Sequence, residues 1–254
     1  MLNIYKWKNK VFFLKNEKYC IICNRTLHSF LPLPRMYTKN WEKAGFPYRA
    51  DDFETLNKNE FSCPFCGATD RDRFYAVYIE QNILANSAFD GILDIAPSSP
   101  LSKWIRKNFS GKYITTDLYM DGVDIRSNIE HMDVFENESF DFVICSHVLE
   151  HVHNDLKAMA ELWRVLRKGG KAIVMVPIVK NFDSVLENPG ITNPIERWKN
   201  FGQDDHIRLY SRKIFLERLI SCGFRVDMFK ASDHKDITWR NGITNGSIIY
   251  IATK

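Results

Sequence analysis

The stretch from Asp141 to Pro177 limits the fold of this chain more than any other part of the sequence. Apolar runs at Phe142–Cys145 and Ala172–Val176 each have the length and composition of a buried strand. The residues between them have the length of a helix. Two apolar strands joined by a helix predict a right-handed crossover unit in a parallel sheet.

The predicted helix has one apolar face. Its apolar residues recur three and four positions apart, as on one buried side of a helix: Leu156, Met159, Ala160, Trp163 and Leu166. Arg164, Arg167 and Lys168 follow in the expected last turn, where positive charge suits the helix dipole. The pair Gly169 and Gly170 is expected to end the helix.

Ser146 and His147 stand directly after the first of the two strands. Parallel sheets bind ligands beside the carboxyl ends of their strands. We therefore expect Ser146 and His147 to line a ligand site at that edge of the sheet.

Four segments, in the right order, resemble the class I S-adenosylmethionine (SAM) dependent methyltransferases, in the subgroup called type 11. SFDFVICSHVLEHV followed by LWRVLRKGGKAIVMVP resembles the middle of these domains. GILDIAPSSPLSKWI resembles their first strand, cofactor loop and first helix, and YITTDLYMDGVDI resembles their second strand. FGQDDHIRLYSRKIFLERLISCGFRV is similar to the late segment of one bacterial branch. The resemblance covers residues 88–254.

This resemblance implies an α/β fold. The sheet would be Rossmann-like, seven-stranded and mostly parallel, with helices on both of its faces. A last hairpin at Arg225–Phe229 and Ser247–Ala252 would supply an antiparallel edge strand. The implied activity is methyl transfer from SAM.

The cofactor loop departs from the family pattern. Most members have a Gly-x-Gly-x-Gly loop, because the backbone must approach SAM closely, but Ala96, Ser98 and Pro100 stand here instead. In one alternative the loop takes a different path and still holds SAM, with Pro100 at the first position of the next helix. In the other, the domain has lost SAM and serves as a scaffold. The retained Asp94 and the small or turn-forming Pro97 and Ser98 favour a competent loop.

The resemblance also implies where the rest of the cofactor binds. Asp117 follows the second apolar strand and would accept hydrogen bonds from both ribose hydroxyls. The alternative is a solvated aspartate in a turn. Leu118 would pack against the adenine, and Asn128 and Ile129 would contact it. Ser146 would line the junction of cofactor and substrate.

Four of the six cysteines form two CxxC pairs: Cys20 with Cys23 and Cys63 with Cys66. Two such turns can complete a tetrahedral four-thiolate zinc site. The 39-residue gap between the pairs is longer than in compact zinc ribbons, so His28 stays a possible substitute ligand. The same cysteines could instead form disulfides or stay free thiols, and the lack of a secretion signal disfavours disulfides. A closed four-thiolate site has no open coordination position, so this zinc is expected to be structural.

The run CPFCGATDRDRFYAVYIE resembles a bacterial arrangement in which a zinc-binding segment precedes a type 11 domain. We therefore expect a zinc-binding accessory segment over residues 1–75 and a methyltransferase domain over residues 76–254. The residues between the two cysteine pairs have no sustained period and predict an ordered but irregular insertion. A helix is expected over Asp70–Leu84.

Three side chains are candidates for catalysis. His206 lies with Asp205 in the loop GQDDHIRLY, where family members build a substrate lid. An Asp–His pair suits a general base and the group that orients it. His147 is the third candidate. The alternative for each is a structural role in anchoring a loop or a helix end.

The segment HVLEH places His147, Glu150 and His151 at i, i+3 and i+4, on one face of a helix. A glutamate-rich version of this spacing binds a divalent metal in the ubiquinone-type O-methyltransferases that the segment resembles. The histidine at the first position argues against a metal here. The alternative is that these residues cap and pin the start of the helix.

The favoured acceptor is an oxygen atom of a small molecule or glycan component. The long loop 178–210 mixes aromatic and charged residues, which would suit a sugar or another polar small molecule and equally a stacked base. RNA methylation, with the zinc segment holding the substrate, is an alternative. Residues 1–75 hold 13 Lys and Arg against 8 Asp and Glu, a small basic excess for a nucleic-acid binder. A third hypothesis is a non-catalytic, zinc-stapled binding module.

No apolar run reaches the roughly 20 residues that span a bilayer. Lysines interrupt the apolar residues of the stretch 1–20, which makes it a poor signal peptide. We therefore expect a cytoplasmic protein without a membrane span. The sequence makes no prediction of its oligomeric state.

Overall fold

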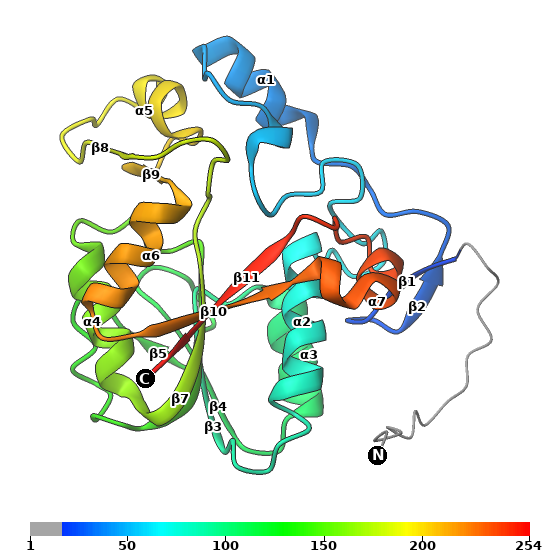
Figure 1. Cartoon of the computed structure of the whole chain (residues 1–254), viewed down its shortest axis with the longest axis vertical. Coiled ribbons are helices and arrows are strands. Elements are labelled where there is room, and N and C mark those ends of the chain that lie inside the picture. The colour runs from blue at the N-terminus through cyan, green and yellow to red at the C-terminus, as the bar shows by residue number, and fades with distance from the viewer. Residues whose placement is uncertain (1–16) are drawn as a thin grey trace.

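The computed structural model describes residues 17–254 (Figure 1). Residues 1–16, which make up most of the stretch interpreted as a poor signal peptide, lie outside the described part. Within residues 17–254, no helix combines the length and the apolar character that a membrane crossing requires.

A seven-stranded sheet forms the centre of the molecule, in the order β10-β11-β7-β6-β3-β4-β5. Its strands are β3 (Gly91–Ile95), β4 (Lys112–Asp117), β5 (Ile125–Arg126), β6 (Phe140–Ser146), β7 (Leu166–Met175), β10 (Arg225–Lys230) and β11 (Ile248–Thr253). The five strands from β5 to β7 are parallel to one another, whereas β11 runs antiparallel to both β7 and β10. The expected mostly parallel sheet with an antiparallel last hairpin is confirmed.

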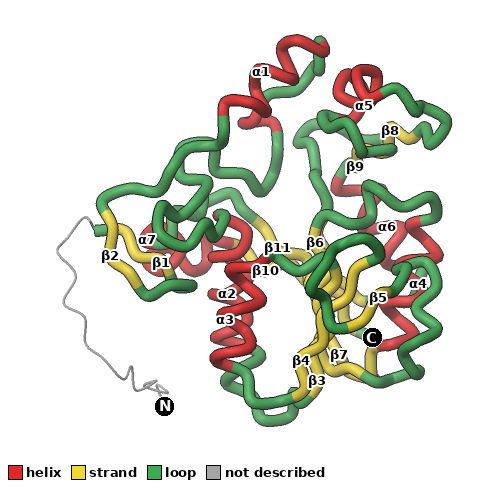
Figure 2. The backbone as a smooth tube through the Cα atoms, turned by 180° about the vertical axis from the view of Figure 1, so that it is seen from behind, coloured by secondary structure: helices red, strands yellow, loops and turns green. Residues whose placement is uncertain are grey.

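Helices cover both faces of this sheet (Figures 1 and 2). α2 (Asp70–Asn82) and α3 (Ser99–Asn108) lie on one side, and α4 (Asp155–Val165) and α6 (Arg212–Ser221) lie on the other. The short helices η2 (Ala231–His234) and α7 (Lys235–Arg240) follow β10 and lie beside α2. The Rossmann-like arrangement is therefore confirmed.

The central crossover helix is shorter than the sequence predicts. α4 ends at Val165, and Leu166 already pairs with Phe140 of the neighbouring strand. The expectation that Arg167 and Lys168 belong to the last helical turn is wrong, because pairing with β6 begins directly after the helix. The four residues after Leu166 form an irregularity in the ladder before pairing resumes. The glycine pair lies in this irregularity and does not end the helix.

The buried face of α4 also differs from the predicted one. The helix buries Asp155, Ala158, Met159, Leu162 and Val165. The prediction is wrong at three exposed positions: Leu156, Ala160 and Trp163. The inward side chain of Asp155 accepts a 2.6 Å hydrogen bond from the Tyr210 hydroxyl and pairs with Arg218. The helix thus presents a charged residue to the core, where it is paired, and a search for apolar periodicity does not find such a position.

The accessory segment contains more regular structure than expected. β1 (Lys18–Cys20) and β2 (Arg25–Leu27) form an antiparallel hairpin, and α1 (Arg35–Ala44) and η1 (Ala50–Asp52) follow. The insertion between the cysteine pairs is therefore partly helical. The domain boundary predicted at residue 75 falls inside α2, whose residues 74–79 are buried in the main core.

A second hydrophobic core joins the accessory segment to the loop 178–210. The loop contains β8 (Val185–Glu187), α5 (Pro194–Phe201) and β9 (Arg208–Tyr210). The core consists of Trp41, Phe46, Ala50, Val179, Phe201 and Leu209. The Trp41 indole donates a 2.8 Å hydrogen bond to the Gly202 carbonyl. The two segments thus form one cover over an end of the central sheet (Figure 1).

Candidate active site and metal centre

The four cysteines of the two CxxC pairs meet in one cluster. Their sulfur atoms lie within 4.8 Å of one another. Cys20 Sγ and Cys66 Sγ are 3.7 Å apart, and Cys23 Sγ and Cys63 Sγ are 3.8 Å apart. A tetrahedron with zinc–sulfur bonds of about 2.3 Å has edges of about 3.8 Å, so the donor set and its spacing fit a zinc ion. His28 is exposed and does not belong to this cluster.

Each CxxC turn is completed by a residue with a left-handed backbone. Asn24 has a φ of 57° and Gly67 a φ of 76°. Their amides donate to the carbonyls of Cys20 and Cys63 at 2.8 and 2.9 Å. All four cysteines are free thiols. The turns therefore hold the sulfur atoms toward one point without a disulfide.

A cavity of about 180 Å³ opens at the carboxyl ends of β3 and β6. Four of the predicted cofactor residues line it: Asp94, Ala96, Ser98 and Ser146. Ala96 has a φ of 53°, in the region that favours glycine, and its amide donates 2.9 Å to the Thr116 carbonyl. Ala96, which stands at the first glycine position of the family loop, thus has the left-handed backbone conformation that glycine favours. α3 begins at Ser99, so Pro100 occupies the second helical position and not the first.

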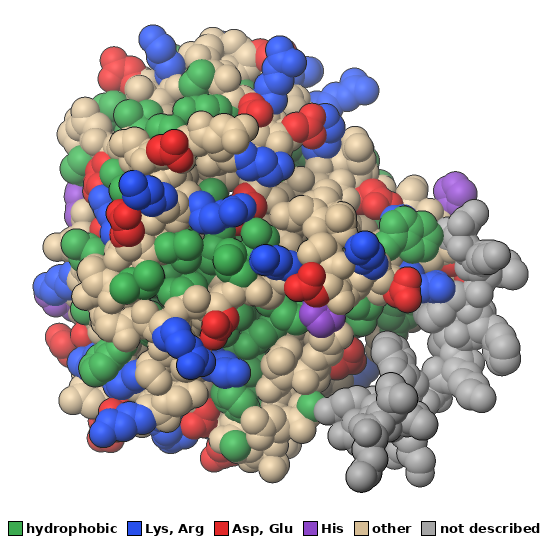
Figure 3. Space-filling view, in the orientation of Figure 1, with side chains coloured by type: hydrophobic (Ala, Val, Ile, Leu, Met, Phe, Trp, Pro, Cys, Tyr) green, Lys and Arg blue, Asp and Glu red, His purple; other side chains and the backbone are tan. Residues whose placement is uncertain are grey.

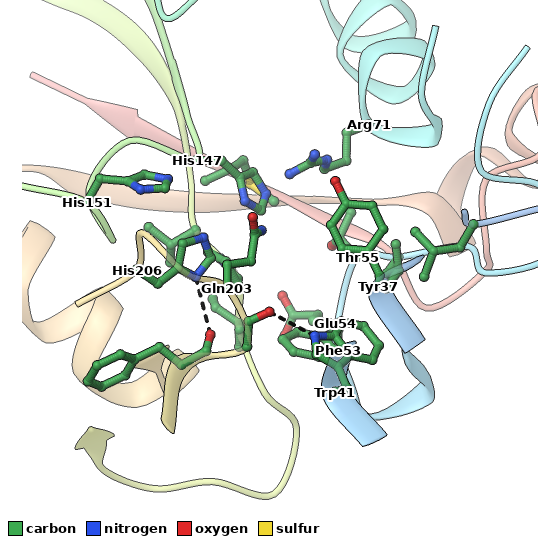
Figure 4. A pocket seen from close by; sticks show the side chains of 18 of the residues that line it. Tyr37, Trp41, Phe53, Glu54, Thr55, Arg71, His147, His151, Gln203 and His206 are labelled. Carbon is green, nitrogen blue, oxygen red and sulfur yellow. Dashed lines mark hydrogen bonds between the residues drawn. The ribbon is translucent and has the colours of Figure 1, made fainter. Parts of the chain in front are cut away.

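A larger cavity of about 350 Å³ lies beside it, under the cover formed by α1 and the loop 178–210 (Figure 4). Tyr37, Trp41 and Phe53 form an aromatic wall on one side. The rings of His151 and His206 lie on the opposite side (Figure 4), and Asp205 also lines the cavity. Arg71 and His147 line both the larger and the smaller cavity, so the two cavities adjoin at these residues.

Three histidines gather around the buried carboxylate of Glu150. His147 Nδ1 lies 3.0 Å from Glu150 Oε1, and His206 Nε2 lies 4.0 Å from the same oxygen. The rings of His151 and His206 meet edge to face, with centroids 4.7 Å apart. Asp205 pairs with His151, at 3.4 Å between Oδ2 and Nδ1. The expected pair of Asp205 with His206 is therefore corrected: His206 Nδ1 faces the backbone, 3.3 Å from the Phe201 carbonyl.

The segment that carries His147, Glu150 and His151 is not helical. α4 begins only at Asp155, after the Asn154 side chain accepts a hydrogen bond from the backbone of Lys157. The expectation of a shared helix face is wrong, because turns bring these side chains together. His147 has a φ of 58°, which directs the chain sharply away from the end of β6.

Residues 82–174 match the model of a family described as a methyltransferase domain. This match assigns residues 82–174 to the type 11 methyltransferase domains. An uncharacterized protein of Methanocaldococcus jannaschii is 46% identical over 63 residues, which are 25% of this chain and 26% of that protein. The aligned part therefore spans about a quarter of the curated relative's length.

Several solved methyltransferase structures are similar to this chain. A SAM dependent methyltransferase of Archaeoglobus fulgidus is 14% identical, with a TM-score of 0.47 over 72% of this chain and 94% of that chain. A putative methyltransferase of Bacillus halodurans is 19% identical, with a TM-score of 0.42 over 69% of this chain and 94% of that chain. The family match rests on residues 82–174, and the strand order of the sheet agrees with the fold of such a domain.

The remaining predicted cofactor residues of the methyltransferase domain lie outside the walls of both cavities. Asp117 ends β4, and its Oδ1 accepts 2.7 Å hydrogen bonds from the amides of Tyr119 and Met120. Leu118 is 40% exposed. The remaining three predicted residues show no contact with either cavity: Pro97, Asn128 and Ile129. Asp117 has a second oxygen that these amides leave open.

Arg71 is the main residue of the site that sequence reasoning missed. Its side chain stands between the two cavities and makes no hydrogen bond within residues 17–254 (Figure 4). Burial and the nearby cation of Arg71 lower the pKa of His147 to about 4. The sequence DRDR around Arg71 offered no signal, because charged residues at the start of a helix are usually solvated.

Proposed function

We propose that the protein is an active SAM-dependent methyltransferase whose acceptor is an oxygen atom of a polar small molecule or a glycan component. The observation that carries the proposal is the pair of adjoining cavities with Arg71 and His147 in their common wall. The smaller cavity would hold the reactive part of SAM, and the larger one would hold the acceptor. Methyl transfer is an in-line displacement, so its rate depends on holding donor and acceptor in contact and alignment.

In this proposal the cofactor runs along the carboxyl ends of the central strands. Asp94, Ala96, Pro97 and Ser98 would surround the methionine portion, beside Ser146. The ribose and adenine would follow the surface formed by the other predicted residues: Asp117, Leu118, Asn128 and Ile129. The left-handed backbone of Ala96 supports a loop that has kept the path of a glycine loop.

The size and lining of the larger cavity favour a small acceptor. Its volume of about 350 Å³ is in the range of small-molecule sites, roughly 300 to 1,000 Å³. Aromatic side chains such as Trp41 and Phe53 provide flat surfaces for a sugar or another ring. The face of the molecule in Figure 3 mixes acidic and basic side chains and shows no continuous basic patch for an RNA substrate.

The candidate catalytic side chains have different places in this cavity. His147 lies nearest the cofactor cavity, so it is the candidate to hold the acceptor hydroxyl as that oxygen approaches the methyl group. His206 and Asp205 line the larger cavity but not the smaller one. Asp205 would orient His151, to which it is paired.

The four-cysteine cluster would hold a structural zinc ion. Cys20, Cys23, Cys63 and Cys66 would fill all four positions of the tetrahedron and leave none for a substrate. When bound, the zinc would fix the hairpin β1–β2 against the turn that precedes α2. The accessory segment could then hold its part of the acceptor cavity in place.

Calorimetric titration of the zinc-loaded protein with S-adenosylhomocysteine (SAH), the demethylated product, tests the proposal. We expect one-to-one binding with a dissociation constant in the micromolar range. Binding would justify a screen of hydroxylated small molecules with labelled SAM. No heat and no thermal shift at millimolar SAH would instead favour a scaffold without cofactor.

A further inference from the structure

We infer that Glu150, His151 and His206 form a second metal site, which takes a divalent transition-metal ion such as Zn²⁺ at the wall of the acceptor cavity. Ligand atoms of these three residues lie within 4.8 Å of one another. Around a cation with bonds of about 2.1 Å, ligand atoms lie roughly 3.4 to 4.2 Å apart, so small side-chain shifts would complete the site. The inference rests on the proposed function in one respect, because that function assigns the cavity to the acceptor.

The carboxylate of Glu150 is the observation that calls for a cation. Its side chain is fully buried, and neither of its oxygens has a hydrogen-bond partner within residues 17–254. The nearest group is His147 Nδ1, 3.0 Å from Oε1, and it forms an ion pair with the carboxylate only when its ring is protonated. The guanidinium of the nearby Arg208 does not neutralise Glu150, because it donates its hydrogen bonds to Glu187 and to backbone carbonyls. A buried carboxylate is ordinarily either paired and hydrogen-bonded or bound to a metal ion. Glu150 lacks the hydrogen bonds of the first arrangement, so a bound metal ion is the alternative.

Both histidines have one ring nitrogen placed beside an acceptor. His151 Nδ1 lies 3.4 Å from the carboxylate of Asp205, and His206 Nδ1 lies 3.3 Å from the carbonyl of Phe201. A proton on each Nδ1 leaves the lone pair of Nε2 for a metal, and His206 Nε2 is the atom that faces Glu150. Metal-bound histidines usually donate their other N–H to a carboxylate or a carbonyl, as both would here.

The two loops that carry the three ligands are held together by the backbone. The Ile207 amide donates a 3.0 Å hydrogen bond to the Glu150 carbonyl. The fully buried Arg208 donates to three carbonyls of the turn at residues 149–153. Ligands held in this way are preorganised for a cation, because the two loops would lose little conformational freedom when it binds.

The site would select the acceptor. His151 and His206 line the larger cavity, and three protein ligands leave positions open on the cation. Oxygen atoms of the acceptor would occupy these positions. This geometry favours a compound with two neighbouring oxygens, such as a diol of a sugar or a catechol.

Titration of the full chain with Co²⁺ or Zn²⁺, after the four-cysteine site has been loaded with zinc, tests the inference. We expect the protein to take up one further equivalent. Glu150→Gln keeps the shape of the side chain and should lower the affinity for this second metal ion at least about tenfold. His206→Gln should have the same effect. Asp204→Asn is the matched control, because Asp204 is an exposed acid of the same loop outside the cluster, and it should bind as the wild type does.

Two results would overturn the inference: no further equivalent in the wild type at about 100 μM free metal, or unchanged affinity in Glu150→Gln. If circular dichroism shows that Glu150→Gln does not fold, His151→Asn replaces it, because that side chain is 33% exposed. SAH is titrated into the same samples. SAH binding without the further metal equivalent overturns the metal site alone, and the further equivalent without SAH binding overturns the proposed function alone.

Discussion

The Tyr113 hydroxyl donates a 2.5 Å hydrogen bond to the carboxylate of Asp94, and both side chains are buried. The two residues stand on the adjacent strands β3 and β4, beneath the cofactor loop. Burial raises the pKa of Asp94 to about 7, although the bond from Tyr113 opposes the rise. The ligand-free protein therefore takes up a proton at Asp94 as the pH falls through neutrality.

We expect the stability of the ligand-free protein to fall as the pH rises from about 4 to about 7 on account of Asp94. The pKa of Asp94 is higher in the folded than in the unfolded chain, so the folded state binds more protons in this window. Asp94→Asn should remove this dependence and raise the free energy of unfolding at pH 8 by on the order of 1 to 3 kcal/mol. Urea unfolding at acidic and alkaline pH measures both effects, and parallel pH profiles of the two proteins would contradict the assignment.

The backbone of Ala96 makes a second prediction. A non-glycine residue with a φ of 53° is strained by on the order of 1 kcal/mol. Ala96→Gly should therefore raise the free energy of unfolding by up to about 1 kcal/mol and leave SAH affinity unchanged. Ala88→Gly, at an exposed position with an ordinary φ, is the control and should give no gain. A loss of stability in Ala96→Gly would show that the loop is not strained.

Asp117 can be tested without disturbing its turn. Asp117→Asn keeps an oxygen for the amides of Tyr119 and Met120 but removes the negative charge. If Asp117 binds the ribose, SAH affinity should fall by about 1 to 3 kcal/mol through lost charge-assisted bonds. Asp121→Asn, an exposed acid of the same loop, should bind SAH as the wild type does. Unchanged affinity in Asp117→Asn would remove Asp117 from the site.

Arg73 and Arg71 are predicted to differ sharply in their effect on stability. The fully buried Arg73 faces the Phe30 ring at 3.7 Å, and its guanidinium donates to the carbonyls of Glu60, Phe61, Ala68 and Asn241. Arg73→Met should lower the free energy of unfolding by about 3 kcal/mol or more, because these acceptors lose their donor. Arg71→Met should change it by less than about 1 kcal/mol. Urea unfolding of both variants decides, and equal losses would contradict the prediction.

Zinc removal is predicted to act through the four-cysteine cluster. Cys63→Ser should lower both the zinc content and the melting temperature, because a three-thiolate site binds zinc less tightly. Cys222→Ser is the control, because Cys222 lies outside the cluster. Metal analysis and thermal unfolding of both variants measure the effect. A full zinc complement in Cys63→Ser would show that Cys63 is not a zinc ligand.

Much of the site could be predicted because its signals are local. Asp94 is the last residue but one of β3 and Ser146 ends β6, and the carboxyl ends of parallel strands meet at one edge of the sheet. The CxxC pairs ending at Cys23 and Cys66 could be interpreted from sequence, because each CxxC turn directs two sulfur atoms to one point. Local spacing failed for the helix face of His147, Glu150 and His151, because the Asn154 cap starts α4 later than the pattern indicates.

The sequence alone predicted the strands and helices of the central sheet, the two CxxC turns and the edge of the sheet at which a ligand would bind, because each has a local signal in the chain. Which side chains share a cavity became visible only in the folded chain. The fold brought His206 beside Glu150 through a backbone bond from Ile207, and it placed Arg71 between two cavities. Such contacts depend on how distant segments pack, and packing is a property of the whole fold.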